Sequence, residues 1–161
     1  NEYPYAKAVI AKLDGALTRI PSQDQLVVPR VAAFEQTADD DGNPLARFTI
    51  EWQVGCELSD SVEYWTFVQA IRPNGSQIAA RATRWPEPPT TSWTLPGRRL
   101  VGPMDVPILS DMKGQYTIRV GLYSPKTGSR PETFDGAQRF LGTLSVKSAG
   151  KKRILEFTPD P

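Results

Sequence analysis

A strict two-residue alternation of apolar and polar side chains over residues 46–54 constrains the fold more than any other feature of this chain. From Ala46 to Val54 every second residue is apolar, and the residues between them are charged or polar. Successive side chains of a strand point to opposite faces of its sheet, so this period is typical of a strand with one buried face. We therefore expect a strand whose core-facing residues are Ala46, Phe48, Ile50, Trp52 and Val54.

The same alternation recurs elsewhere and indicates an all-β chain. It runs from Tyr116 to Leu122, and residues 62–71 are apolar on both faces, as in a central strand covered on each side. Turn-forming clusters separate the apolar runs, and we expect a turn at residues 39–44 and hairpins closed by residues 73–75 and 125–128. No segment has the strand–helix–strand pattern of a parallel sheet. The sequence predicts an antiparallel, two-sheet β-sandwich of about eight strands, with fainter strands over 27–34, 77–83, 100–108, 140–146 and 153–158.

The N-terminal segment, residues 1–25, has a different period. Val9, Leu13, Leu17 and Ile20 follow helical spacing, and Pro21 ends the pattern. We expect a short helical segment or linker over residues 1–25, followed by one sandwich domain over residues 26–161.

Composition excludes several classes of function. The 19 Lys and Arg residues nearly balance the 18 Asp and Glu residues, so no single-signed field is available to attract nucleic acid. The chain has no histidine, which removes the commonest general base and zinc ligand, and its single cysteine, Cys56, cannot form an intrachain disulfide. No apolar run is long enough to insert into a membrane. We expect no cofactor and no enzymatic activity.

The segment that leads into the second clear strand resembles the tyrosine corner of immunoglobulin-like folds. Asp111 and Gly114 precede Tyr116, which stands near the start of the strand, as the corner tyrosine does. Ile118 takes the place of the second cysteine of antibody domains, so the resemblance is to disulfide-free relatives such as fibronectin type III-like modules. It implies an immunoglobulin-like sandwich in which Tyr116 is structural.

A longer resemblance covers residues 88–130. Its parts are Pro-Pro-Thr-Thr-Ser-Trp at 88–93, Leu-Pro-Gly at 95–97, Gly-x-Tyr at 114–116, Val-Gly-Leu-Tyr at 120–123 and Thr-Gly-x-Arg at 127–130. Together they resemble the β-sandwich appended to bacterial polytopic membrane proteins of the glycosyltransferase type, on their extracytoplasmic side. The resemblance implies a non-catalytic module in the periplasm, at the cell surface or secreted, whose partner is another domain or subunit of the parent protein.

A stiff Pro-rich loop flanked by Trp85 and Trp93 is the best ligand candidate in the sequence. Exposed indoles stack on sugar rings or anchor protein partners, and Arg84 and Arg98, with Arg81 and Arg99 nearby, would supply hydrogen bonds. The alternative is architectural: Trp93 pins the loop to the sandwich and Trp85 covers an edge. These alternatives differ in whether the two rings are exposed.

Acidic residues offer weaker candidates. Asp39, Asp41 and Asn43 gather oxygens that a hard cation prefers, but Gly42 and Ile50 stand at the wrong positions for an EF-hand loop, which favours a solvated hairpin tip. Glycoside hydrolysis needs two carboxylates at one cleft, and Glu51 and Glu63 fall on separate predicted strands. The leading interpretation is a structural or protein-interaction module, and the alternative is a carbohydrate-binding module.

Overall fold

The computed structural model describes residues 27–54, 63–75, 77–93, 97–128 and 138–160. These residues form strands and turns, with one turn of 3-10 helix, η2 (Thr90–Ser92), between the fourth and fifth strands. The eight strands are β1 (Val27–Ala38), β2 (Pro44–Val54), β3 (Trp65–Ile71), β4 (Ile78–Arg84), β5 (Gly97–Pro107), β6 (Gly114–Tyr123), β7 (Gln138–Ala149) and β8 (Lys152–Pro159).

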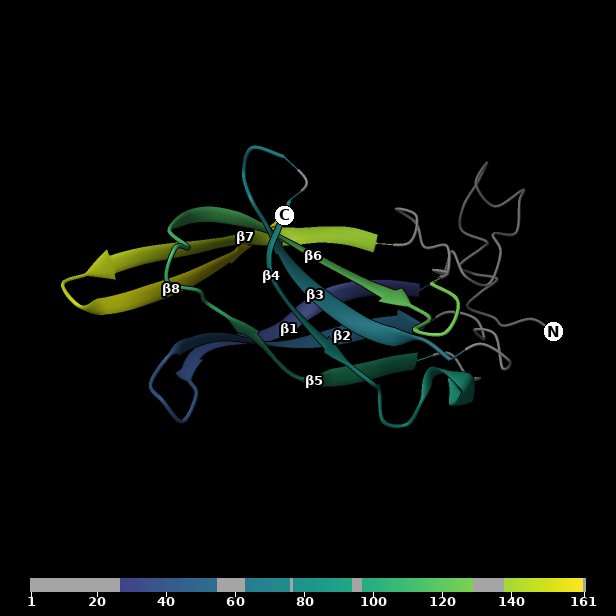
Figure 1. Ribbon diagram of the computed structural model, residues 1–161. Helices are drawn as coiled ribbons and strands as arrows, with labels where there is room; N and C mark the ends of the chain where they lie inside the picture. Colours follow the sequence, from purple (N-terminus) through teal and green to yellow (C-terminus); the bar gives the residue numbers. More distant parts are fainter. Residues whose placement is uncertain (1–26, 55–62, 76, 94–96, 129–137, 161) are drawn as a thin grey trace.

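The strands form two sheets. One contains three strands in the order β1-β2-β5, and the other contains five in the order β4-β3-β6-β7-β8. Every pairing is antiparallel, and the β1–β2 and β7–β8 hairpins project on the same side of the view in Figure 1. The prediction of an all-β, antiparallel, two-sheet chain with eight strands is confirmed. The helix expected over residues 1–25 lies outside the described residues.

The core forms between the two sheets from the residues that the alternation selects. All five predicted core residues of β2, from Ala46 to Val54, are fully buried. In β6, Tyr116, Ile118, Val120 and Leu122 face them from the other sheet and are also buried. Burying a large apolar side chain contributes about 1.5–3 kcal/mol, so these two strands fix how the sheets pack.

Both faces of β3 are covered, as its sequence predicts. Val68 and Ala70 point into the core between the sheets. Phe67, Gln69 and Ile71 alternate with them and point to the outer face of the five-stranded sheet, and they too are buried. Side chains on the outer face of the five-stranded sheet therefore pack against one another and shield these β3 residues from solvent.

Bulges shift the alternation in β1 and in β7, two strands where the sequence signal is faint. The register of β1 on β2 slips between Val31 and Ala33, and both Val31 and Phe34 pack against the core. The register of β7 on β6 slips beside Ile118, so that Leu141 packs inward while its neighbour Phe140 is exposed. An extra residue in one strand reverses which side chains face the core beyond it.

Two of the turns that the sequence indicates close hairpins, and the third, at residues 125–128, does not. Residues 39–43 close the β1–β2 hairpin, and residues 73–75 lie in the β3–β4 hairpin. Residues 125–128 form a turn in which the Gly128 N–H donates to the Ser124 carbonyl, 2.8 Å away. This turn opens a longer connection to β7, because residues 129–137 separate it from that strand.

Two side chains join the sheets at their edges. The Gln36 amide in β1 reaches β8, where its Oε1 accepts from the Leu155 N–H at 2.9 Å and its Nε2 donates to the Arg153 carbonyl at 2.8 Å. At the opposite edge, Arg84 of β4 donates to the Pro103 carbonyl of β5 at 3.1 Å. The two layers are thus held by polar contacts as well as by the core.

Candidate functional site

The Pro-rich loop between β4 and β5 is packed into the sandwich through Trp93. This residue is only 1% exposed, and its indole N–H donates to the Pro88 carbonyl at 3.1 Å. Its backbone N–H donates to the Thr90 carbonyl at 3.0 Å, which closes η2. Sugar stacking requires a ring face that is open to solvent, and Trp93 offers none. Its burial matches the architectural alternative of the sequence analysis.

Thr90 fastens the same loop to the start of β3. It is fully buried, and its Oγ1 accepts a hydrogen bond from the Tyr64 N–H at 2.9 Å. A buried backbone N–H without a partner costs about 1–3 kcal/mol, so this bond accounts for a threonine at that position. The Pro-Pro-Thr-Thr-Ser-Trp segment, residues 88–93, is therefore an ordered loop that packs against one end of the sandwich through Thr90 and Trp93.

The other three ligand candidates are not brought together with Trp93. Trp85 is 39% exposed, and its indole N–H donates to the carboxylate of Glu63. Arg84 is bonded to β5, as described above, and Arg98 lies 3.5 Å from a carboxylate oxygen of Glu51. Within the described ranges, no hydrogen bond, ion pair or ring contact joins any two of these four candidates.

At the acidic tip of the β1–β2 hairpin, the carboxylate oxygens of Asp39 accept hydrogen bonds from within the same loop. Asp39 Oδ1 accepts from the backbone N–H groups of Asp41 (2.9 Å) and Asn43 (2.8 Å), and Oδ2 accepts from the Asn43 side-chain amide at 3.1 Å. Hydrogen bonds from Asn43, first from its backbone and then from its side chain, hold the pKa of Asp39 below its ordinary value. Across the ranges that the structure describes, no three His, Cys, Asp or Glu residues are grouped as metal ligands.

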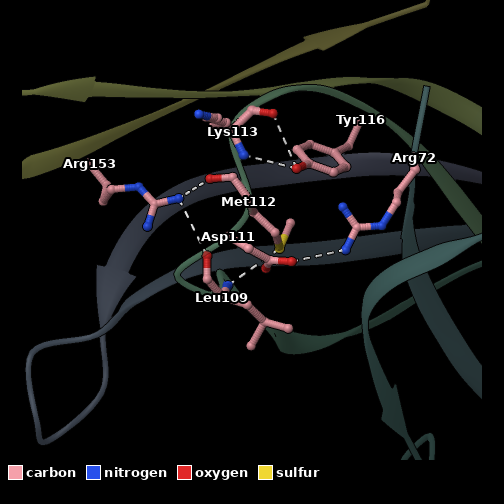
Figure 2. Close-up of polar contacts among 7 residues, drawn as sticks. All are labelled: Arg72, Leu109, Asp111, Met112, Lys113, Tyr116 and Arg153. Atoms are coloured by element: carbon pink, nitrogen blue, oxygen red, sulfur yellow. Dashed lines mark hydrogen bonds and ion pairs between the residues drawn. The ribbon is translucent and has the colours of Figure 1, made fainter. Parts of the chain in front are cut away.

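The connection between β5 and β6 is held by Tyr116 (Figure 2). Its hydroxyl accepts from the Lys113 N–H at 2.9 Å and donates to the Lys113 carbonyl at 3.2 Å. Within the same connection, the Leu109 N–H lies 3.4 Å from the Met112 sulfur, and Met112 is fully buried. These contacts are local and architectural.

Two arginines from other strands reach the same connection (Figure 2). Arg153 of β8 donates through Nη2 to the carbonyls of Leu109 and Met112, and Arg72, which follows β3, lies 3.4 Å from Asp111. The Arg153 Nε is buried without a hydrogen-bond partner among the described residues. The connection thus receives contacts from strands on both sides of β6 in the five-stranded sheet.

Charged side chains on the outer face of the three-stranded sheet neutralise one another. Arg47 makes a bidentate contact with Asp105, at 2.8 and 3.1 Å, and lies 3.9 Å from Glu35. The hydrogen bond from Arg47 is the main cause that lowers the pKa of Asp105. These three residues sit side by side in the register of β1, β2 and β5.

The carboxylates considered for glycoside hydrolysis do not share a cleft. Glu51 lies on the three-stranded sheet, where it bonds Arg30 at 2.8 Å and faces Arg98. Glu63 precedes β3 in the other sheet and accepts from Trp85. Each carboxylate therefore has its own partner on a different layer.

A trough on the outer face of the five-stranded sheet is a feature that the sequence analysis did not predict. It has a volume of about 360 Å³ and is lined by Phe67, Gln69, Arg81, Thr83 and Tyr123 from β3, β4 and β6. The sequence signal for it is the polar Gln69 in a strand that is apolar on both faces. That signal becomes specific only when the register places the neighbouring strands beside it.

Comparison with known proteins identifies no relative: the chain matches no family model, no curated protein sequence and no solved structure. In the part of the chain that the structure describes, no helix has the length and hydrophobicity of a membrane span.

Proposed function

We propose that this chain is an immunoglobulin-like sandwich of the fibronectin type III kind that serves as a non-catalytic interaction module of a larger protein. Two findings support the fold. The sheet order β1-β2-β5 opposite β4-β3-β6-β7 follows the order expected of such a sandwich, with β8 as an addition. Tyr116 bonds back to the backbone just upstream, as a corner tyrosine does.

The observation that carries the interaction role is the composition of the outer face of the five-stranded sheet. Phe67, Tyr123 and Phe140 point to this face together with Arg81 and Arg119. Phe140 is 51% exposed and lies under the Arg119 guanidinium, 6.0 Å from it. Aromatic residues and arginine are the residue types that dominate the binding energy of protein interfaces.

A protein partner is favoured over a glycan because the tryptophan pair does not form a platform. Trp93 is in the core, and the indole N–H of Trp85 is engaged by Glu63. We further propose, from the resemblance of residues 88–130 to modules appended to bacterial membrane glycosyltransferases, that the parent protein is bacterial and that this module is extracytoplasmic. The partner is then another domain or subunit of that parent.

Site-specific photo-crosslinking in cells of the source organism tests the proposal. A photoreactive residue replaces Phe140 on the outer face of the five-stranded sheet, and a matched variant carries it at Leu100, which is exposed on the three-stranded sheet. We expect a discrete adduct from position 140, identified by mass spectrometry as a segment of the parent or of one partner protein, and none from position 100. Equal adducts from both positions, or none from either, would refute the interaction role of this face.

A glycan array with the purified chain tests the alternative. Saturable binding that is lost in Trp85→Ala, with the fold intact, would support the carbohydrate-binding function instead. We expect no saturable binding.

A further inference from the structure

The trough on the five-stranded sheet has a specific shape. Tyr123 and Phe67 form an aromatic corner, with ring centroids 6.1 Å apart and ring planes inclined by 55°. Across the corner, Gln69 pairs with Arg81 in the register of β3 on β4, and Phe67 pairs with Thr83. The apolar corner is thus bordered by a guanidinium, an amide and two hydroxyl groups.

The charge of the strands that build the trough has one sign. β3, β4 and β6 together contain three arginines, Arg81, Arg84 and Arg119, and no Asp or Glu. Arg84 is bonded to β5 and Arg119 to Gln69. Arg81 is exposed and makes no hydrogen bond or ion pair with any residue in the described ranges. An arginine left without a counter-charge beside a trough is complementary to a carboxylate.

The position of Gln69 adds a second donor. Its Oε1 accepts from the Nε of Arg119 at 2.8 Å, so its amide nitrogen is the end that remains to donate. That nitrogen has no hydrogen-bond partner among the described residues, although the residue is only 7% exposed. It is not one of the buried side-chain atoms without a partner, so it is open to solvent at the trough and can donate to an acceptor on a ligand.

We propose that this trough binds the carboxylate of an Asp or Glu side chain presented by a protein partner. Arg81 and the amide of Gln69 bind the carboxylate oxygens. The partly exposed ring of Tyr123, which contacts the buried ring of Phe67, packs against the methylene groups of the same side chain. The inference deepens the proposed interaction role and rests on it, because it names the chemistry that the partner presents to this face.

Two features favour a side chain over the carboxylate of an acidic sugar. Phe67 is only 3% exposed, so its ring has no open face on which a sugar could stack. Phe140 lies in the same cross-strand row as Gln69 and Arg119 and is exposed. Since strands are spaced by about 4.8 Å, the row from Arg81 to Phe140 spans about 14 Å, which a partner segment of a few extended residues covers.

Amide chemical shifts of the ¹⁵N-labelled chain, titrated with N- and C-capped glutamate at constant ionic strength, test the proposal. Capped glutamine is the matched probe that lacks the charge. We expect saturable shifts at the amides of Gln69, Thr83 and Tyr123 with glutamate only. Because hydrogen bonds to a charged group contribute about 1.5–3 kcal/mol, Arg81→Gln should weaken binding at least about tenfold.

Arg98→Gln is the charge-matched control, since Arg98 is exposed on the other sheet. We expect it to bind capped glutamate as the unmodified chain does, and the spectra of both variants report whether the fold is retained. Equal shifts with glutamine, undiminished binding in Arg81→Gln, or no saturable shift at any concentration would each overturn the proposal. Galacturonate serves as a third probe, and saturable shifts with it alone would assign the trough to an acidic sugar and overturn the proposal as well.

The crosslinking experiment and the glutamate titration test separate claims, so a negative result in one can be told apart from a negative result in the other. A crosslink at position 140 without glutamate binding would leave the interaction role standing and remove only the acidic chemistry of the partner. The absence of a crosslink would remove the interaction role itself.

Discussion

The hydroxyl of Tyr116 is bonded to both backbone groups of Lys113, three residues earlier in the chain. It accepts from the N–H at 2.9 Å and donates to the carbonyl at 3.2 Å, while the tyrosine ring is buried between the sheets. One side chain therefore joins the core to the connection between β5 and β6. These two hydrogen bonds give the connection a fixed geometry.

Replacing Tyr116 by Phe should destabilise the chain by about 1–3 kcal/mol, because two backbone groups lose their partner while the ring still fills its site. Urea denaturation followed by tryptophan fluorescence measures this change. Tyr123→Phe is the control, since the Tyr123 hydroxyl has no hydrogen-bond partner in the described ranges, and its effect should stay below about 0.5 kcal/mol. Equal effects of the two substitutions would show that the corner does not stabilise the fold.

Replacing Gln36 by Ala should open the edge of β8. The amide of Gln36 occupies the Leu155 N–H and the Arg153 carbonyl, which a neighbouring strand would otherwise use. We expect a loss of about 1–2 kcal/mol in the free energy of unfolding and faster hydrogen exchange at the Leu155 amide. Gln115→Ala, at an exposed position of β6, is the control. Unchanged exchange at Leu155 would contradict the role assigned to Gln36.

Replacing Trp93 by Ala should reduce the stability of the fold much more than replacing Trp85 by Ala. Removing the buried indole of Trp93 leaves a cavity beneath the Pro-rich loop, which should lower the free energy of unfolding by about 3–5 kcal/mol. Trp85 is partly exposed, so its loss should cost less than about 1 kcal/mol. Thermal and urea denaturation of both variants measure the difference. Similar losses for the two would contradict the assignment of Trp93 to the core, and Trp93→Phe provides a folded variant if Trp93→Ala does not fold.

The contact between Arg47 and Asp105 should make stability depend on pH in the acid range. Because Arg47 lowers the pKa of Asp105 below its ordinary value of 3.8, folding favours the ionised carboxylate. Its contribution is therefore fully present above the unfolded pKa and is lost as the pH falls through the folded pKa. At this partly exposed site it should amount to about 1 kcal/mol or less.

Thermal denaturation of the unmodified chain and of Asp105→Asn, between about pH 7 and pH 2, measures this dependence. The stability difference between them should be constant near neutral pH and should vanish at the acid end. Because the ion pair is already absent in Arg47→Gln, adding Asp105→Asn to that variant should change stability little at any pH. A difference that persists at the acid end would show that Asp105 acts through packing.

The sequence by itself determined the elements that depend on a regular period. The alternation from Ala46 to Val54 and from Tyr116 to Leu122 correctly selected the core residues of β2 and β6, because a pleated strand with one buried face admits no other pattern. Turn residues likewise placed the β1–β2 and β3–β4 hairpins. Local chemistry was sufficient for each of these features.

The tertiary structure alone decided which residues meet. The bulge beside Leu141 turned Phe140 outward, and no two-residue period encodes such a slip. Trp85 and Trp93, eight positions apart in one loop, took opposite roles because only Trp93 reaches the core. The trough required Arg81, Gln69 and Tyr123 from three strands, and a sequence cannot place them together because strand order and register are set by the packing of the whole sandwich.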